Sequence, residues 1–327
     1  KATAAAGAIM DVHTGELVAM VSVPDFDPER PSEALQPDRI NRMTTGVYEL
    51  GSAFKAFTTA MALDTGRIGV DTTFASRALD EGVFADYESG AAAAGDAAAY
   101  AIPGSSALTA IDYSDVCLNY DLGWFEESDL DAPSGFEDLA DPAYAGLLSV
   151  TNPATSSPGL AFLLATVAEF GEDGWEDYWG SLAENDLRVT ASWSDTYFTD
   201  FSVPNYGGDY PVVLSYASSP PSEVIDGEPS SAALLDTCFR QVEYAGVLEG
   251  APNPVGGQAV IDWLLSDDFQ ASVPANMYVY PVSSTVEVPA DWAEFAPLAD
   301  DPHTLDPEAI TAGRDGWIEA WTGIVLD

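Results

Sequence analysis

The charge composition of this chain changes abruptly near Arg67, and this change limits what the chain can fold into. Residues 1–68 carry nine acidic and six basic side chains, so their net charge is −3. Residues 69–327 carry the other 45 of the 54 acids against four of the ten bases, so their net charge is −41. All eight tryptophans lie after the change. The composition therefore predicts two segments of unrelated origin, and a motif in one segment says nothing about the other.

The acidic excess narrows the class of partner. A net charge of −44 on 327 residues repels nucleic acid and anionic lipid, so neither is an expected partner. Two explanations fit the excess: an acidic partner-binding protein, or a halophilic protein adapted to high salt, where the Debye length falls to about 3 Å at 1 M. Because the acids are dispersed and form no tail, the sequence favours adaptation to high salt.

Length and the rarer residue types set further limits. The chain is long enough for two lobes, and it has no run of about 18 apolar residues that could span a membrane. Its two histidines, His13 and His303, form no cluster with cysteines, so no transition-metal site and no cofactor are predicted. Cys117 and Cys238 could form one disulfide in an oxidising compartment or remain two buried thiols, and the sequence leaves both open.

The first 68 residues predict a β-hairpin followed by a helix. Two β-rich runs within residues 7–24 meet at a glycine-containing turn, and residues 56–66 read as a small-residue helix that Gly66 ends. Ser52 and Lys55 lie one helical turn apart, a spacing at which a lysine of depressed pKa can activate a serine for acyl transfer. An isolated pair of this kind is more often structural than catalytic.

This segment resembles the start of the transpeptidase domain of class B penicillin-binding proteins. The resemblance rests on the hairpin and on residues 25–28 (DFDP), 41–42 (NR) and 48–55 (YELGSAFK), and it covers about residues 5–67. That family also uses a Ser-x-Asn triplet and a Lys-Thr-Gly or Lys-Ser-Gly strand, and this chain has neither. The resemblance implies a nucleophile, Ser52, and its base, Lys55, without their partners, so the expectation is an inactive fragment.

The remaining residues alternate short β-rich runs with amphipathic helices, which predicts an α/β architecture. The predicted elements are helices at residues 157–170, 257–265 and 306–325 and a buried strand at residues 212–216. Aromatic side chains recur beside small polar residues at the ends of these elements, as in Trp193 and Tyr216. Such a group would suit a flat cationic ligand, because each cation–π or stacking contact contributes about 0.5–2 kcal/mol when desolvated.

The same segment resembles the thiamine-binding proteins of ABC importers. The resemblance covers about residues 69–325 and rests on motifs that occur in the same order: 69–74 (GVDTTF), 78–84 (ALDEGVF), 155–160 (TSSPGL), 188–197 (RVTASWSDTY), 213–220 (VLSYASSP), 269–274 (FQASVP) and 278–282 (YVYPV). It implies a two-lobed type II periplasmic-binding-protein fold that binds thiamine or a thiamine phosphate. The protein would then be an extracytoplasmic monomer that delivers its ligand to a membrane permease and is not an enzyme.

The resemblance also implies a binding site and a domain organisation. The residues expected to stack on the ligand rings are Trp193, Tyr216 and Tyr278, the last standing where the family more often has tryptophan. Asp71 would face the ligand, and Ser156 and Ser157 would hold its hydroxyl or phosphate tail at a helix N-terminus. The implied domains are residues 69–110 and 246–327 for lobe 1 and residues 111–245 for lobe 2, with residues 1–68 replacing the start of lobe 1. The chain is therefore interpreted as a chimera.

Overall fold

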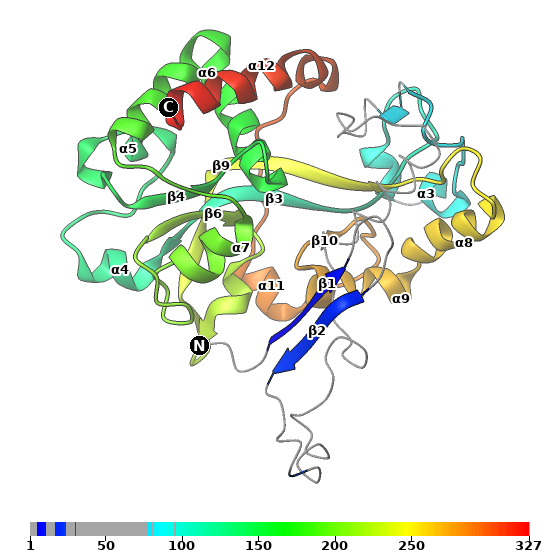
Figure 1. Ribbon diagram of the computed structural model, residues 1–327, viewed down its shortest axis with the longest axis horizontal. Helices are drawn as coiled ribbons and strands as arrows, with labels where there is room; N and C mark the ends of the chain where they lie inside the picture. Colours follow the sequence, from blue (N-terminus) through cyan, green and yellow to red (C-terminus); the bar gives the residue numbers. More distant parts are fainter. Residues whose placement is uncertain are drawn as a thin grey trace. The chain divides into compact units, whose positions relative to one another are not determined.

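The computed structural model describes most of the chain after residue 77 and two strands before it (Figure 1). The described residues are 5–10, 17–23, 30, 78–79, 81–94 and 96–326. The chain divides into two compact units, Lys1–Met61 and Ala62–Asp327. The predicted helix at residues 56–66, the Ser52 and Lys55 pair and Asp71 lie outside the described residues.

The first unit contains a β-hairpin. Strand β1 (Ala5–Met10) pairs antiparallel with strand β2 (Leu17–Val23), with Ala5 opposite Val23 and an irregularity after Ile9. Strand β2 lies within the β-rich runs predicted at residues 7–24 and β1 begins two residues before them, so the predicted hairpin strands are confirmed.

The second unit is built on one mixed sheet. Its strands are β3 (Thr109–Asp121), β4 (Leu148–Thr151), β5 (Arg188–Thr190), β6 (Val212–Tyr216), β9 (Ser231–Ala245) and β10 (Tyr280–Pro281). One edge of β3 pairs with β9 along its whole length. The other edge pairs first with β10, at Tyr113, and then with β6, from Val116 onward. The long strands β3 and β9 therefore run through both halves of the unit (Figure 1), and the predicted strand at residues 212–216 is confirmed.

Helical segments and one small hairpin cover the sheet. The helical segments are α3 (Gly90–Ala94), η4 (Asp96–Tyr100), α4 (Leu122–Glu127), α5 (Phe136–Leu139), η5 (Pro142–Tyr144), α6 (Ser157–Glu184), α7 (Trp193–Asp195), η6 (Thr196–Asp200), η7 (Pro220–Glu223), α8 (Pro254–Leu264), α9 (Asp267–Gln270), α10 (Val273–Met277), α11 (Ala290–Phe295) and α12 (Pro307–Val325). The hairpin consists of β7 (Val224–Ile225) and β8 (Glu228–Pro229).

The main core lies between the sheet and the helices α6 and α12, which lie side by side (Figure 1). Trp175 and Trp179 on α6 and Trp321 on α12 are almost completely buried. The rings of Trp179 and Trp321 meet edge to face at 5.5 Å between centroids, a preferred aromatic geometry. The lobe boundaries at residues 110 and 246 remain a prediction, and α12 contacts α6 across them.

Two of the predicted helices agree with the observed ones only in part. Helix α6 begins at Ser157 and is regular up to Phe170, as predicted; Gly171 has the non-helical angles φ 69° and ψ 177°, and a second helical segment continues beyond this kink to Glu184. The helix at residues 257–265 begins earlier, at Pro254, where the Asn253 side chain accepts a hydrogen bond from Gly256 N. The C-terminal helix is as predicted: the Asp306 carboxylate caps α12 by accepting from Glu308 N at 2.8 Å. No helix in the described part of the chain is long and apolar enough to cross a membrane.

Candidate functional site

The candidate site lies where three parallel strands end. Strand β4 pairs in parallel with both β5 and β6, so the carboxyl ends of the three strands lie at the same edge of the sheet. In open α/β sheets this edge is where ligands bind. The ends of these strands and the segments that follow them carry four of the six predicted binding residues: Ser156 and Ser157 follow β4, Trp193 follows β5 and Tyr216 ends β6.

The segment after β4 brings the N-terminus of α6 to this edge. Ser156 is the N-cap residue of α6, and its side chain makes no capping hydrogen bond. The preceding Thr155 donates its hydroxyl to the Ala191 carbonyl at 2.8 Å, which ties the start of α6 to the segment after β5. A Cβ atom at Gly159 would lie only 2.4 Å from the Thr151 carbonyl oxygen, so only glycine allows the helix to start this close to the strand. The unpaired N–H groups of the first turn of α6 are therefore available near Ser156 and Ser157.

The segment after β5 places an indole ring over the end of β6. Trp193 is half-buried and donates its indole N–H to the Ser215 hydroxyl at 3.0 Å. Its ring stacks on Tyr197, with 5.0 Å between centroids and 16° between planes, and meets Tyr216 edge to face at 5.9 Å. Phe198, half-exposed, contacts the Trp193 ring from another side at 5.4 Å. Trp193 is thus held in one orientation by three rings and one hydrogen bond, and the structure brings Trp193 and Tyr216 into contact.

The loop that follows β6, residues 216–219, is fixed by small polar side chains. The hydroxyls of Ser215 and Ser219 lie 2.7 Å apart, and the Ser219 hydroxyl accepts from Tyr216 N at 3.3 Å. Ser218 donates its hydroxyl to the Tyr278 carbonyl at 2.7 Å. This contact connects Tyr278, whose side chain is 53% exposed, to the same loop that carries Tyr216.

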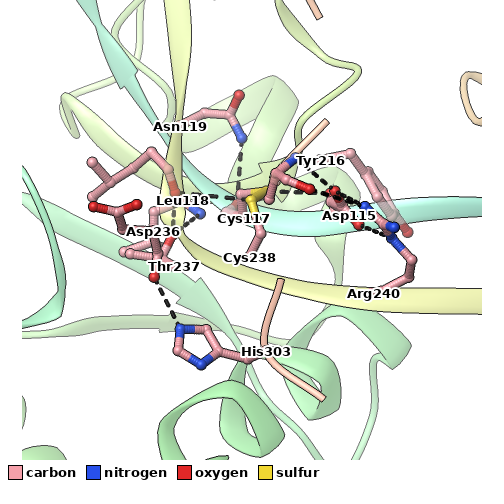
Figure 2. Close-up of a disulfide and its surroundings, with 12 residues drawn as sticks. Asp115, Cys117, Leu118, Asn119, Tyr216, Asp236, Thr237, Cys238, Arg240 and His303 are labelled. Atoms are coloured by element: carbon pink, nitrogen blue, oxygen red, sulfur yellow. Dashed lines mark hydrogen bonds and ion pairs between the residues drawn. A yellow bond between two sulfur atoms is a disulfide. The ribbon is translucent and has the colours of Figure 1, made fainter. Parts of the chain in front are cut away.

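A disulfide lies behind this loop (Figure 2). Cys117 on β3 and Cys238 on β9 are bonded, with 4.2 Å between their Cα atoms, and both are fully buried. Val116 lies opposite Phe239 and Leu118 lies opposite Leu234, so the register of the two strands is irregular between these pairs. Cys238 is one of the additional residues of β9 at this irregularity. Ala217 of the loop packs against the disulfide. The structure thus decides a pairing that the sequence left open.

An ion pair lies next to the disulfide and ties three segments together (Figure 2). Arg240 on β9 donates two hydrogen bonds to the Asp115 carboxylate on β3, at 2.7 and 2.8 Å. The same carboxylate accepts from Ala299 N at 3.0 Å, and the Asp115 carbonyl accepts from Ala217 N at 2.8 Å. Because the Asp115 side chain is fully buried, this bidentate pair is needed to compensate its charge. The loop after β6 therefore rests on a rigid support.

The electrostatics around the site are negative. Each of the three arginines within residues 78–94 and 96–326 is in an ion pair with an aspartate: Arg188 with Asp200, Arg240 with Asp115 and Arg314 with Asp315. Burial, and then the charges of Glu243 and Asp112, raise the pKa of the Tyr216 hydroxyl. Acidic groups thus face this aromatic residue, and the arrangement suits a ligand that carries positive charge.

Glu223 is a buried acid that the sequence analysis did not single out. It ends η7, four residues after Ser219, and its side chain is fully buried. The Ser231 hydroxyl donates to it, and the Tyr197 hydroxyl, 3.5 Å from the Ser219 carbonyl, also interacts with it. Burial raises the pKa of the Glu223 carboxyl to about 7. Nothing in the sequence distinguishes Glu223 from the many exposed acids of this chain.

The site is an arrangement of side chains at the sheet edge, and two cavities of the second unit lie away from it. Within the described residues a depression of about 420 Å³ lies around α4, and a cavity of about 140 Å³ lies between Tyr87 and Ala110. Neither is lined by Trp193, Tyr216 or Tyr278.

Known protein families match the two segments of the chain separately. The sequence family of bacterial extracellular solute-binding proteins matches residues 68–300, and the penicillin-binding protein transpeptidase family matches residues 5–108. The chain is similar to a thiamine-binding periplasmic protein of Escherichia coli, with 27% identity over 78% of this chain and 74% of that protein. It is also similar to a probable peptidoglycan D,D-transpeptidase of Caulobacter vibrioides, with 47% identity over 22% of this chain but only 12% of that protein.

Solved structures give the same result for the fold. A periplasmic thiamin-binding protein superposes with a TM-score of 0.64 and 25% identity, covering 76% of this chain and 75% of that one. A ferric-binding protein from Campylobacter jejuni also reaches a TM-score of 0.64, at 13% identity, over 86% of this chain and 93% of that one. These likenesses confirm the type II periplasmic-binding-protein fold, and the two sequence matches confirm that the chain is chimeric.

Proposed function

We propose, from the premise that this chain belongs to the family of bacterial extracellular solute-binding proteins, that residues 69–325 capture thiamine or a thiamine phosphate for an ABC importer. The observation that carries the proposal is the meeting of Trp193, Tyr216 and the N-terminus of α6 at the carboxyl edge of three parallel strands. A solute-binding protein of this kind acts outside the cytoplasm, as a monomer, and delivers its ligand to a membrane permease.

The aromatic and acidic character of the site supports a flat cation as the ligand. Thiamine carries a pyrimidine ring and a positively charged thiazolium ring, and both can stack on the faces of Trp193, Tyr216 and Tyr278. The three arginines within residues 78–94 and 96–326 are each paired with an aspartate, which offsets their positive charge. The acids Glu243 and Asp112 lie on the side of the Tyr216 hydroxyl, where they favour a cation.

The other end of the ligand has a partner at the start of α6. The first-turn N–H groups of this helix, together with the hydroxyls of Ser156 and Ser157, can donate hydrogen bonds to the hydroxyl or phosphate tail of the ligand. Asp71 completes the proposed set on the side of the first lobe. The assignments of Ser156, Ser157, Asp71 and Tyr278 rest on the family resemblance.

The proposed location agrees with the disulfide. Disulfides persist in oxidising compartments such as the periplasm or the cell surface and are rare in the cytosol. A fully buried Cys117–Cys238 bond is therefore expected in a protein that is exported before it folds.

A fluorescence and calorimetric titration with thiamine in molar salt tests the proposal. We expect saturable quenching of tryptophan fluorescence and heat of binding in the parent protein, and loss of both in Trp193→Ala. The matched control is Trp263→Ala, because Trp263 is 56% exposed on α8, outside the site, and its loss should leave the dissociation constant unchanged. A cooperatively folded sample that gives no heat with thiamine or its phosphates, or a Trp193→Ala variant that binds normally, would refute the proposal.

The transpeptidase-like segment supports a second candidate function, a serine acyltransferase with Ser52 as nucleophile and Lys55 as base. The match of residues 5–108 to the transpeptidase family favours it. A fluorescent penicillin should then label the protein, and Ser52→Ala should abolish the label. Absence of labelling in the parent protein, or labelling that persists in Ser52→Ala, would leave residues 1–68 without an enzymatic role.

A further inference from the structure

Tyr278 has an unusual backbone conformation for a residue with a large side chain. It follows the last residue of α10 and has φ 58° and ψ 33°. Residues other than glycine, asparagine and aspartate rarely adopt this left-handed conformation. It is one of three non-glycine residues with a positive φ in the described part of the chain. Such a conformation persists only where other contacts hold it.

The contact that holds it comes from the loop after β6. Ser218, which is 1% exposed, donates its hydroxyl to the Tyr278 carbonyl at 2.7 Å, although the two residues are 60 positions apart in the sequence. The carbonyl that accepts this bond belongs to the residue with the left-handed conformation. The hydrogen bond therefore acts directly on the peptide unit that orients the Tyr278 side chain.

The donor is fixed more firmly than the acceptor. Ala217, next to Ser218, donates its N–H to the Asp115 carbonyl at 2.8 Å and packs on the Cys117–Cys238 disulfide. On the other side, Ser219 is tied to Ser215 and to Tyr216 N. The loop thus connects Tyr278 to the strands β3 and β9.

The loop that binds Tyr278 also carries a ring of the aromatic group around Trp193. Tyr216, two residues before Ser218, meets the Trp193 ring edge to face at 5.9 Å between centroids. The hydrogen bond from Ser218 to the Tyr278 carbonyl therefore connects Tyr278 to the loop that bears Tyr216.

We infer that Ser218 is a positioning residue for the binding site: its hydrogen bond holds Tyr278 in the left-handed conformation, and so holds the phenol ring where it covers the ligand. The inference rests on the proposed function and adds to it a residue that touches no ligand itself. Ser218 is required because a ring at the end of a five-residue helix, half-exposed, has little other packing to fix it.

A double-mutant cycle tests this role. The dissociation constant for thiamine is measured by calorimetry in molar salt for the parent protein, Ser218→Ala, Tyr278→Ala and the double variant. We expect Ser218→Ala to weaken binding about three- to tenfold, the effect of losing one buried neutral hydrogen bond. In the Tyr278→Ala background the same substitution should have no further effect. Equal effects in both backgrounds would show a general structural role, and no effect in the parent would remove the role altogether; either result overturns the inference.

Two further variants protect the test against simple misfolding. Ser222→Ala, an exposed serine four residues later, is the matched control and should leave the dissociation constant unchanged. Ser218→Cys replaces the hydroxyl with a somewhat larger group that is a weaker donor, so it should give an intermediate loss of affinity. Equal affinity of Ser218→Cys and Ser218→Ala would contradict a role for the hydrogen bond.

A measurement without ligand separates this inference from the proposed function. If the parent protein does not bind thiamine, the proposed function fails, and the position of Tyr278 is then followed by fluorine NMR after incorporation of 3-fluorotyrosine. The resonance that disappears in Tyr278→Phe belongs to Tyr278. It should shift or broaden in Ser218→Ala and stay in place in Ser222→Ala. An unchanged resonance in Ser218→Ala would refute the positioning role whether or not thiamine binds.

Discussion

Replacing Glu223 by glutamine should raise the unfolding free energy relative to the parent at pH 8. At pH 4 the two proteins should have similar unfolding free energies. The Glu223 side chain is fully buried, and none of the ion pairs among the described residues includes it. Burial raises the pKa of its carboxyl from 4.5 to about 7, the nearby charge of Asp121 acts in the same direction, and the hydrogen bonds from Ser231 and Tyr197 oppose the rise. The neutral carboxylic acid is thus the form that the folded protein prefers.

The sign and the size follow from linkage. Because the folded protein binds this proton more tightly than the unfolded chain, the stabilising contribution is complete below pH 4.5 and is lost as the pH rises through about 7. The two pKa values differ by about 2.5, and one pKa unit corresponds to about 1.4 kcal/mol, so the loss amounts to about 3 kcal/mol of unfolding free energy. Glutamine cannot ionise, so the variant avoids this loss while it keeps the shape and most hydrogen-bonding atoms.

Urea unfolding followed by tryptophan fluorescence measures the effect. The experiment compares parent and Glu223→Gln at pH 4, 5, 6, 7 and 8 in molar salt, and the difference between the two cancels the titration of other carboxyls. The matched control is Glu228→Gln, the same substitution at an exposed position of β8. A difference between parent and Glu223→Gln that does not change with pH would show that Glu223 is not the buried, proton-binding group described here.

Three more results are expected. Cys117→Ala/Cys238→Ala should lower the unfolding free energy by about 2–4 kcal/mol in urea titrations, because the disulfide closes a loop of 121 residues in the unfolded chain; an unchanged midpoint would contradict this. Arg240→Lys should destabilise the protein by about 1–3 kcal/mol, because lysine cannot make the two parallel hydrogen bonds to buried Asp115; equal midpoints in denaturant titrations would argue against it. Raising the salt from 0.2 to 2 M should raise the Tm, because a net charge of −44 repels itself less when screened; calorimetric scans that show a constant or lower Tm would oppose adaptation to high salt.

Much of the local structure could be predicted because its causes lie within a few residues. The Asp306 carboxylate caps α12 by reaching Glu308 N, two residues away, and Pro307 occupies the first helical position. The bounds of β6, residues 212–216, follow from an apolar run that ends at polar serines. The end of the predicted helix at Phe170 coincides with the non-helical backbone of Gly171, whereas the second helical segment, which buried Trp175 and Trp179 anchor to the core, was not predicted.

The site could be predicted only in part. Trp193 and Tyr216 contact each other, and the binding roles of these two residues and of Ser156, Ser157, Asp71 and Tyr278 remain predictions. The supporting residues Ser218 and Glu223 gave no signal, because a serine in a polar loop and a glutamate in an acidic chain are ordinary in sequence.

The sequence by itself determined that this chain joins two segments of different origin, because composition and motif order need no folding to be read. It also determined the helices and strands whose caps and apolar runs are local. Only the tertiary structure decided that Cys117 pairs with Cys238, that Asp115 meets Arg240, and that Ser218 reaches Tyr278. These contacts join residues 60 or more positions apart, and they depend on the register and the irregularity of β3 and β9, which form only when the whole sheet is assembled.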